Sequence, residues 1–91
     1  MSDSEPPLTI SHDPSQQRFI GPQGSQLSYE LGPNSEMIIN HVGVPTALRG
    51  RGIAAQLVDA ALLDARENGR SVVPVCSYAS SYMKRKGLLD Q

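Results

Sequence analysis

The residues best suited to chemistry lie in the middle of the chain, where residues 49–54 read Arg-Gly-Arg-Gly-Ile-Ala. They precede a stretch with helical periodicity, and the start of a helix presents unpaired N–H groups and the positive end of the helix dipole. Two glycines let an anion approach the backbone closely, while Arg49 and Arg51 supply charge that pairs with phosphate. The segment therefore predicts a cradle for a phosphate or pyrophosphate group. The alternative is a tight turn that only leads into the helix.

Other phosphate-binding motifs fit this segment poorly. A Walker A loop requires Gly-Lys followed by Ser or Thr, and the sequence has none. A dinucleotide-binding loop requires a third glycine and an early strand, whereas Ala55 follows here and three predicted strands come before the one that leads into the loop. Arg-Gly repeats can bind RNA, but a single copy without nearby aromatic residues disfavours nucleic acid.

Two further residues could do chemistry on either side of this segment. His41 lies in the apolar run before it and could act as a general base. Cys76 comes before the last helical stretch, where the helix dipole favours a nucleophilic thiolate. The structural alternatives are a strand histidine that makes a hydrogen bond and a buried, inert cysteine. A single cysteine excludes an internal disulfide and a multi-cysteine zinc site, and no metal site is predicted.

The surrounding pattern predicts an α/β (α+β) domain. Short apolar or alternating runs separated by Gly, Pro and Asn predict strands, and apolar residues every three or four positions predict helices. Because Pro74 cannot donate to a ladder, one side of the last strand is expected to be unpaired or splayed there, and Ser77 and Gly87 are expected to cap and end the last helix. We expect a mixed, mostly antiparallel sheet of about five strands, one long right-handed crossover helix between neighbouring parallel strands, and one short C-terminal helix. The expected strands are 8–11, 17–20, 26–31, 36–44 and 71–76, and the expected helices are 53–68 and 78–86.

Length and composition limit the possible classes of protein. The chain has 91 residues, of which 38% are hydrophobic and 19% charged, with a formal net charge of −1. This balance predicts one soluble domain, residues 8–91, preceded by a flexible segment, residues 1–7. No apolar run reaches the roughly 20 residues that span a bilayer, and the polar N-terminus does not resemble a secretory signal, so we expect a cytoplasmic protein.

Charge is unevenly distributed along the chain. Residues 1–45 carry a net charge of −4 and residues 46–91 a net charge of +3. A cationic half suits an anionic ligand, although an ordinary solvated surface gives the same count.

Taken together, these features resemble the GNAT N-acetyltransferases. Residues 49–54 fit the Arg/Gln-x-x-Gly-x-Gly/Ala signature of that superfamily, whose loop binds the pyrophosphate of acetyl-CoA. The preceding Val44-Pro45, the amphipathic helix and the apolar strand follow in the family's order. More narrowly, the chain resembles the minimal YjdJ-type GNAT-like proteins over about residues 8–86. The shared features are His41, Ala65-Arg66 with Gly69, and Pro-x-Cys76-Ser77-Tyr78 with Tyr82.

The resemblance implies a truncated GNAT fold that lacks the two helices usually found between the first two strands. It implies acetyl-CoA as cosubstrate, with pantetheine in the gap between the fourth and fifth strands, against backbone groups near Val42 and Val44. Lys84, Arg85 and Lys86 could meet the 3′-phosphate of CoA or form a solvated helix end. The implied loop contacts are Arg49, Gly50, Arg51, Gly52, Ile53 and Ala54.

The same resemblance implies an acetyl-CoA-dependent N-acetyltransferase. Direct attack by the amine is the default route, with His41 as base and Tyr82 as proton donor to the thiolate, and relay through Cys76 is the minor route. The implied acceptor is a small amine or a protein amine, with no membrane partner, and we expect a monomer or weak homodimer.

Two departures from the family pattern keep other functions open. Many members carry a carboxylate on the fourth strand where Gly43 stands, and typically a threonine where Val42 stands. The absent carboxylate and acceptor helices favour a non-catalytic acyl-CoA-binding or regulatory module. A more distant alternative is a domain whose Arg-Gly-Arg loop contacts acidic proteins or RNA.

Overall fold

The computed structural model describes residues 10–88. Of the two N-terminal predictions, the flexible segment 1–7 lies outside these residues and the strand at 8–11 lies partly outside them. The α-helices and strands are β1 (Ser11–Asp13), β2 (Arg18–Ile20), β3 (Gln26–Leu31), β4 (Met37–Gly43), α1 (Ile53–Glu67), β5 (Val72–Pro74) and α2 (Ser77–Arg85), with short 3-10 turns at Pro22–Gly24 and Thr46–Leu48.

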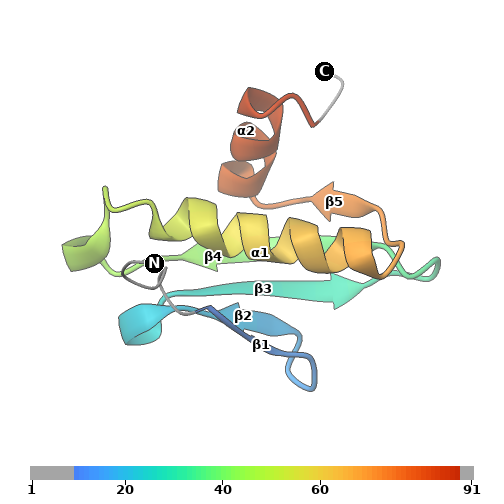
Figure 1. Ribbon diagram of the computed structural model, residues 1–91, viewed down its shortest axis with the longest axis horizontal. Helices are drawn as coiled ribbons and strands as arrows, with labels where there is room; N and C mark the ends of the chain where they lie inside the picture. Colours follow the sequence, from blue (N-terminus) through green and yellow to red (C-terminus); the bar gives the residue numbers. More distant parts are fainter. Residues whose placement is uncertain (1–9, 89–91) are drawn as a thin grey trace, which may run out of the picture.

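The strands form one sheet in the order of the chain, β1-β2-β3-β4-β5. The first three pairings are antiparallel, and β4 and β5 are parallel. Helix α1 connects β4 to β5 and lies along one face of the sheet, while α2 stands beside β5 (Figure 1). This arrangement confirms the predicted mixed, mostly antiparallel sheet with one long crossover helix and one short C-terminal helix. Neither helix is long and apolar enough to cross a bilayer.

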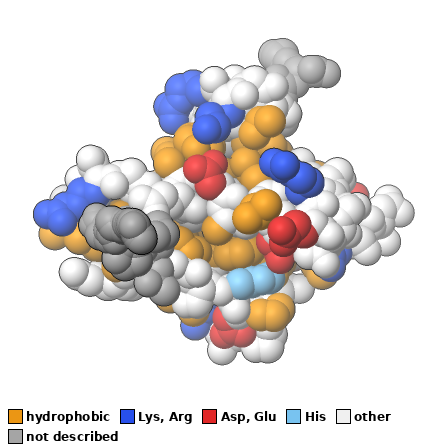
Figure 2. All heavy atoms as spheres, in the orientation of Figure 1, with side chains coloured by type: hydrophobic (Ala, Val, Ile, Leu, Met, Phe, Trp, Pro, Cys, Tyr) orange, Lys and Arg blue, Asp and Glu red, His pale blue; other side chains and the backbone are white. Residues whose placement is uncertain are grey.

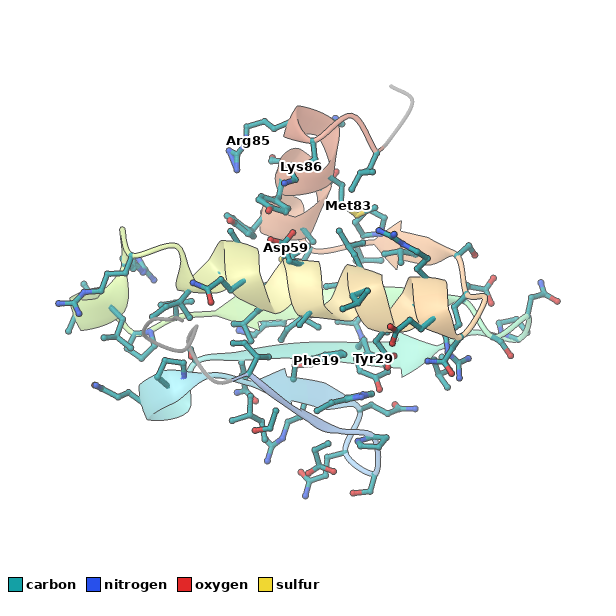
Figure 3. All side chains as sticks on the ribbon, viewed as in Figure 1. Phe19, Tyr29, Asp59, Met83, Arg85 and Lys86 are labelled. Atoms are coloured by element: carbon teal, nitrogen blue, oxygen red, sulfur yellow. The ribbon has the colours of Figure 1, made fainter. Side chains whose placement is uncertain are left out.

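The core lies between α1 and the sheet. The apolar stripe of α1 packs on side chains from the middle strands, since residues three and four apart share one face of a helix. Helix α2 joins this core through Ala79 and Tyr82. The hydroxyl of Tyr82 donates a 2.8 Å hydrogen bond to Asp59 Oδ1 on α1, and thereby ties the two helices together. Figure 3 shows Asp59 on the side of α1 that faces α2.

A glycine follows the C-terminal end of each helix. Gly69 and Gly87 have φ of 68° and 74°, the left-handed conformation that glycine adopts without steric cost. After α2, the N–H of Gly87 bonds to Lys84 O and that of Leu88 to Met83 O, which satisfies carbonyls of the last turn. The prediction that Ser77 caps α2 is wrong by one residue: Cys76 holds the cap position in extended geometry, and Ser77 is already helical.

The first strand is displaced from its expected position. The expected strand ends at residue 11, but β1 extends to Asp13 and the turn follows it, with Gln17 at φ 56°. The reason is packing of His12. Its ring stacks on Phe19 with centroids 4.1 Å apart, and Nε2 lies 2.6 Å from Tyr29 Oη. These contacts hold His12 in the sheet.

Pro74 marks the outer edge of the sheet. Ser71 O accepts the N–H of Met37, and the N–H of Val75 bonds to Ile39 O, so alternate residues of β5 direct their backbone groups toward β4. The nitrogen of Pro74 therefore faces away from β4, where the missing N–H breaks no bond of the ladder.

Candidate functional site

The site begins where β4 and β5 separate. Their pairing ends at Ile39, whose carbonyl accepts the N–H of both Val75 and Cys76 at 3.0 Å. Strand β4 continues to Gly43. Within residues 10–88, the edge of β4 from Asn40 to Gly43 that faces away from β3 has no strand partner, and its backbone groups are available to a ligand.

A bulge in β4 coincides with this separation. Ser28 is opposite His41 and Tyr29 is opposite Ile39, so Asn40 is an extra residue in β4. Because a bulge bends its strand and increases the local twist, we attribute the divergence of β4 from β5 to it.

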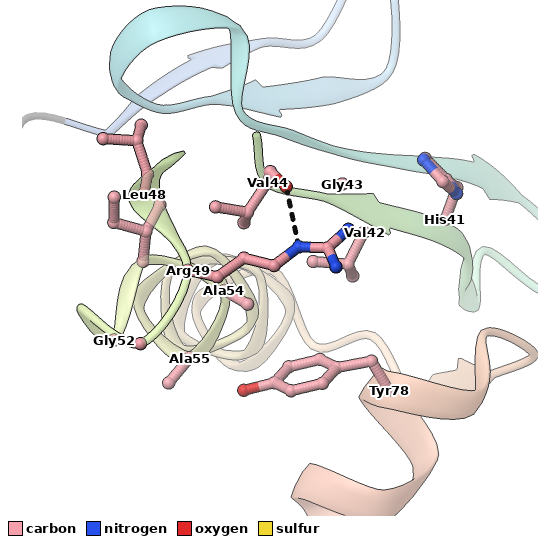
Figure 4. Close-up of a pocket in the computed structure, with 12 residues that line it drawn as sticks. His41, Val42, Gly43, Val44, Leu48, Arg49, Gly52, Ala54, Ala55 and Tyr78 are labelled. Atoms are coloured by element: carbon pink, nitrogen blue, oxygen red, sulfur yellow. Dashed lines mark hydrogen bonds between the residues drawn. The ribbon is translucent and has the colours of Figure 1, made fainter. Parts of the chain in front are cut away.

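A cavity of about 680 Å³ lies between this free edge and the start of α1 (Figure 4). The volume is that of a typical small-molecule or cofactor site. The side opposite β4 consists of the loop and the first turn of α1, and α2 contributes one aromatic ring. The lining residues are His41, Val42, Gly43, Val44, Leu48, Arg49, Gly50, Gly52, Ile53, Ala54, Ala55 and Tyr78.

The loop before α1 leaves the helix start open. Gly50 and Gly52 have φ of 84° and 78°, and a Cβ built at either position would meet no atom within 4 Å. Glycine is thus required here by backbone conformation, and there is room for a ligand beside it. Gly52 is the N-cap, so no side chain caps the helix, and the first turn carries no acidic residue. The positive end of the dipole is therefore uncompensated by side chains among residues 10–88.

Arg49 extends from the loop into the cavity (Figure 4). Its Nε donates a 3.3 Å hydrogen bond to Val44 O, and the side chain is otherwise exposed. The contact is long for an N–H···O bond. The guanidinium is thus held loosely beside the free edge of β4.

The structure brings together the residues expected to bind the cofactor. All of them line the cavity except Arg51, which is exposed.

The residues expected to be catalytic are not brought together. His41 is exposed and lines the cavity, and its ring lies over Gly43. Cys76 is half-buried against the core and does not line the cavity.

Tyr82 also lies outside the cavity, in the interface between α1 and α2. Burial, and then the hydrogen bond to Asp59, raises the pKa of Tyr82 to about 12. The aromatic residue in the cavity is instead Tyr78, whose ring stacks on that of Tyr82 at 6.0 Å.

The basic cluster at the end of α2 lies on the same face of the molecule as α1 (Figure 2). The cations of Arg85 and Lys86 lie 5.7 and 5.5 Å from the centre of the Tyr82 ring. At these distances cation–π attraction holds both side chains near the helix.

Four residues that line the cavity were not predicted from the sequence: Gly43, Leu48, Ala55 and Tyr78. Tyr78 had a usable signal, because it opens a helix directly after the predicted strand. Leu48 had none, since the 3-10 turn that buries it was not predicted.

Comparison with known families agrees with this geometry. The family model described as GCN5-related N-acetyl-transferase matches residues 19–90, so the chain belongs to that family. Its five-stranded sheet and two helices are a truncated form of the GNAT fold. No curated protein gives a significant match. Membership indicates acyl transfer as the general activity, with acetyl-CoA as the cosubstrate typical of the family.

Proposed function

We propose that this protein is an acetyl-CoA-dependent N-acetyltransferase of the minimal YjdJ type, and that CoA binds in the cavity between β4 and α1. One observation carries the proposal: an unpaired strand edge and an uncapped helix start face each other across a cavity of about 680 Å³. The strand edge suits the amides of pantetheine, and the helix start suits a pyrophosphate.

In this proposal the pyrophosphate binds the backbone N–H groups around Gly50, Gly52, Ile53 and Ala54. Arg49 turns from Val44 O to a phosphate oxygen, because a charge-assisted hydrogen bond is stronger than one to a neutral carbonyl. That movement frees Val44 O. Arg51 adds positive charge from outside the cavity.

Pantetheine then extends along β4, and its amides bond to backbone groups at Val42 and Val44. It takes the place that a longer β5 would occupy. The thioester lies beyond these contacts, toward His41 and the bulge at Asn40.

For transfer, His41 takes a proton from the acceptor ammonium, directly or through water. The free amine attacks the thioester carbonyl, the C–S bond of the tetrahedral intermediate breaks, and the thiolate leaves. We assign protonation of the thiolate to Tyr78, because it lines the cavity, whereas the hydroxyl proton of Tyr82 is directed to Asp59. Tyr82 then positions Tyr78 by stacking.

Relay through Cys76 is the minor route. The acetyl group would move to Sγ with release of CoA thiol, and the amine would then attack this second thioester. Mass spectrometry of the protein after acetyl-CoA treatment tests the relay, because an acetyl thioester on Cys76 is the intermediate of this route.

A non-catalytic acyl-CoA-binding module is the second candidate. Its support is that no carboxylate of residues 10–88 lines the cavity. A more distant candidate is a domain that binds acidic proteins or RNA.

Calorimetry with CoA, acetyl-CoA and AMP separates these functions, followed by an assay of thiol release with a panel of small and peptide amines. We expect CoA and acetyl-CoA to bind more tightly than AMP, and at least one amine to release thiol. Binding without product in any amine favours the passive module. No binding of CoA at millimolar concentration leaves only the interaction domain.

A further inference from the structure

The face of the sheet opposite α1 carries a row of polar residues that leads to His41. Arg18 is opposite Ser28, and Ser28 is opposite His41. Directly opposed residues point to the same face of a sheet. The adjacent row, His12-Phe19-Leu27-Val42, packs toward α1, so the row Arg18-Ser28-His41 points away from it.

No helix of residues 10–88 covers this face. Ile38 and Val73, which are paired on it, are half-buried and 42% exposed, respectively. A molecule approaching from this side can therefore reach His41, and through it the cavity.

Arg18 has hydrogen-bond donors to spare on this face. Its Nη1 donates to Gln26 Oε1 at 3.2 Å, but its Nε is buried and has no acceptor. Asp13 is opposite Arg18 in the ladder, but its carboxylate accepts a 2.7 Å bond from Ser15 Oγ, and among the described residues no carboxylate forms an ion pair with Arg18. Because Nε is buried, the donors left for a ligand are those of the Nη groups. A guanidinium with free Nη donors matches a carboxylate, which accepts two parallel N–H bonds.

Arg18 and His41 also lean in the same direction along the sheet. Arg18 reaches toward Gln26, the ring of His41 lies over Gly43, and Gln26 and Gly43 are opposite each other. The two side chains therefore stand on β2 and β4 with only β3 between them, about 9–10 Å apart at two strand spacings.

From this arrangement we infer that the acceptor is an amine that also carries a carboxylate, held by Arg18 while its amino group lies at His41. Gln26 and Ser28 form the floor between the two ends. The span selects compounds whose amine and carboxylate are separated by a flexible chain, and it rejects α-amino acids, in which the two groups are adjacent. This inference rests on the proposed function, because it places the acceptor of the same reaction.

The test compares 6-aminohexanoate, hexylamine and glycine as acceptors, by thiol release from acetyl-CoA. The variants are Arg18→Met, Arg18→Lys and, as a control, Arg66→Met on the exposed last turn of α1. We expect wild type to prefer 6-aminohexanoate at least 10-fold in kcat/KM. Arg18→Met should remove this preference by raising KM for 6-aminohexanoate alone. Arg18→Lys should keep part of the preference, and Arg66→Met should keep all of it. KM for acetyl-CoA should not change in any variant.

NMR of the protein with CoA present measures binding of the same three compounds. This measurement tests the carboxylate site separately from the proposed enzyme activity. If no amine is acetylated but 6-aminohexanoate binds in an Arg18-dependent way, the proposed enzyme fails and the carboxylate site stands. Equal use and equal binding of hexylamine and 6-aminohexanoate would overturn the inference. A dimer that Arg18→Met dissociates would also overturn it, because a second copy would then cover this face. Thermal melting shows whether Arg18→Met is folded. If it is not, Arg18→Lys replaces it as the test variant.

Discussion

The imidazole of His41 lies directly over the backbone of Gly43, two residues along the same strand. A Cβ built on Gly43 would stand 2.8 Å from Nε2 of His41, closer than real Cβ contacts. The absence of a side chain at position 43 thus leaves room for the imidazole of His41, a residue that lines the cavity.

Replacing Gly43 by alanine should displace His41 and slow acetyl transfer. We expect kcat to fall about 10-fold, a partial loss of the roughly 10²- to 10⁴-fold that a positioned general base contributes, while the affinity for CoA is retained. The measurement is steady-state kinetics together with CoA calorimetry. Since the effect acts through His41, the double variant Gly43→Ala/His41→Ala should be no slower than His41→Ala alone. Additive losses would show that Gly43 acts independently.

Replacing Arg49 by alanine should weaken CoA binding. Loss of a hydrogen bond between charged groups costs about 1.5–3 kcal/mol, which is roughly a 10- to 150-fold increase in Kd. Calorimetry with CoA measures it, and Arg66→Ala at the opposite end of α1 is the matched control. If both variants bind CoA like wild type, Arg49 makes no phosphate contact.

Replacing Gly52 by valine should weaken CoA binding by more than the accompanying loss of protein stability explains. Its left-handed conformation costs a side chain about 1–2 kcal/mol, and a side chain there would also enter the space proposed for the pyrophosphate. Gly69→Val is the matched control, since Gly69 has φ of 68° and equally open surroundings at the other end of α1. Both variants should melt at lower temperature, but only Gly52→Val should lose CoA affinity. If Gly52→Val and Gly69→Val bind CoA with equal affinity, the loop is only a turn that leads into α1.

Stability should decline in alkali partly through Tyr82. Burial and the bond to Asp59 raise its pKa to about 12, above the ordinary value of about 10. Between these values the unfolded chain binds fewer protons than the folded one, so the free energy of unfolding falls as the pH rises, and the contribution is complete only below pH about 10. Urea denaturation between pH 9 and 11.5 should show a shallower decline for Tyr82→Phe than for wild type. Lysine deprotonation affects both proteins, and parallel slopes would contradict the assignment.

Local signals in the sequence were sufficient for much of the fold. The helical period of 53–68, the glycines after both helices and the turns between strands each act over a few residues, so α1, α2 and a mostly antiparallel sheet could be predicted. The site loop could be predicted for the same reason, because glycine and arginine before a helix have a local physical meaning. The position of β1 could not, since it depends on His12 packing against Phe19 and Tyr29 across two strands.

The same limit applies to the details of the site. The bulge at Asn40 is a shift in the register of β4 against β3, and no residue near position 40 predicts it. Of two tyrosines four residues apart on α2, only Tyr78 reaches the cavity, because Tyr82 meets Asp59 from α1. Such choices depend on tertiary contacts and cannot be read from spacing.

The orientation of Pro74 has a consequence for the behaviour of the protein at high concentration. The outer side of β5 is an edge at which this sheet could grow by recruiting a strand from another molecule, and the exposed Val73 and Val75 would favour such growth. An incoming chain would find no donor at Pro74 and a ring in its path. The proline therefore acts as a stop against fibre formation, and its replacement by valine should shorten the lag time of aggregation in a thioflavin assay.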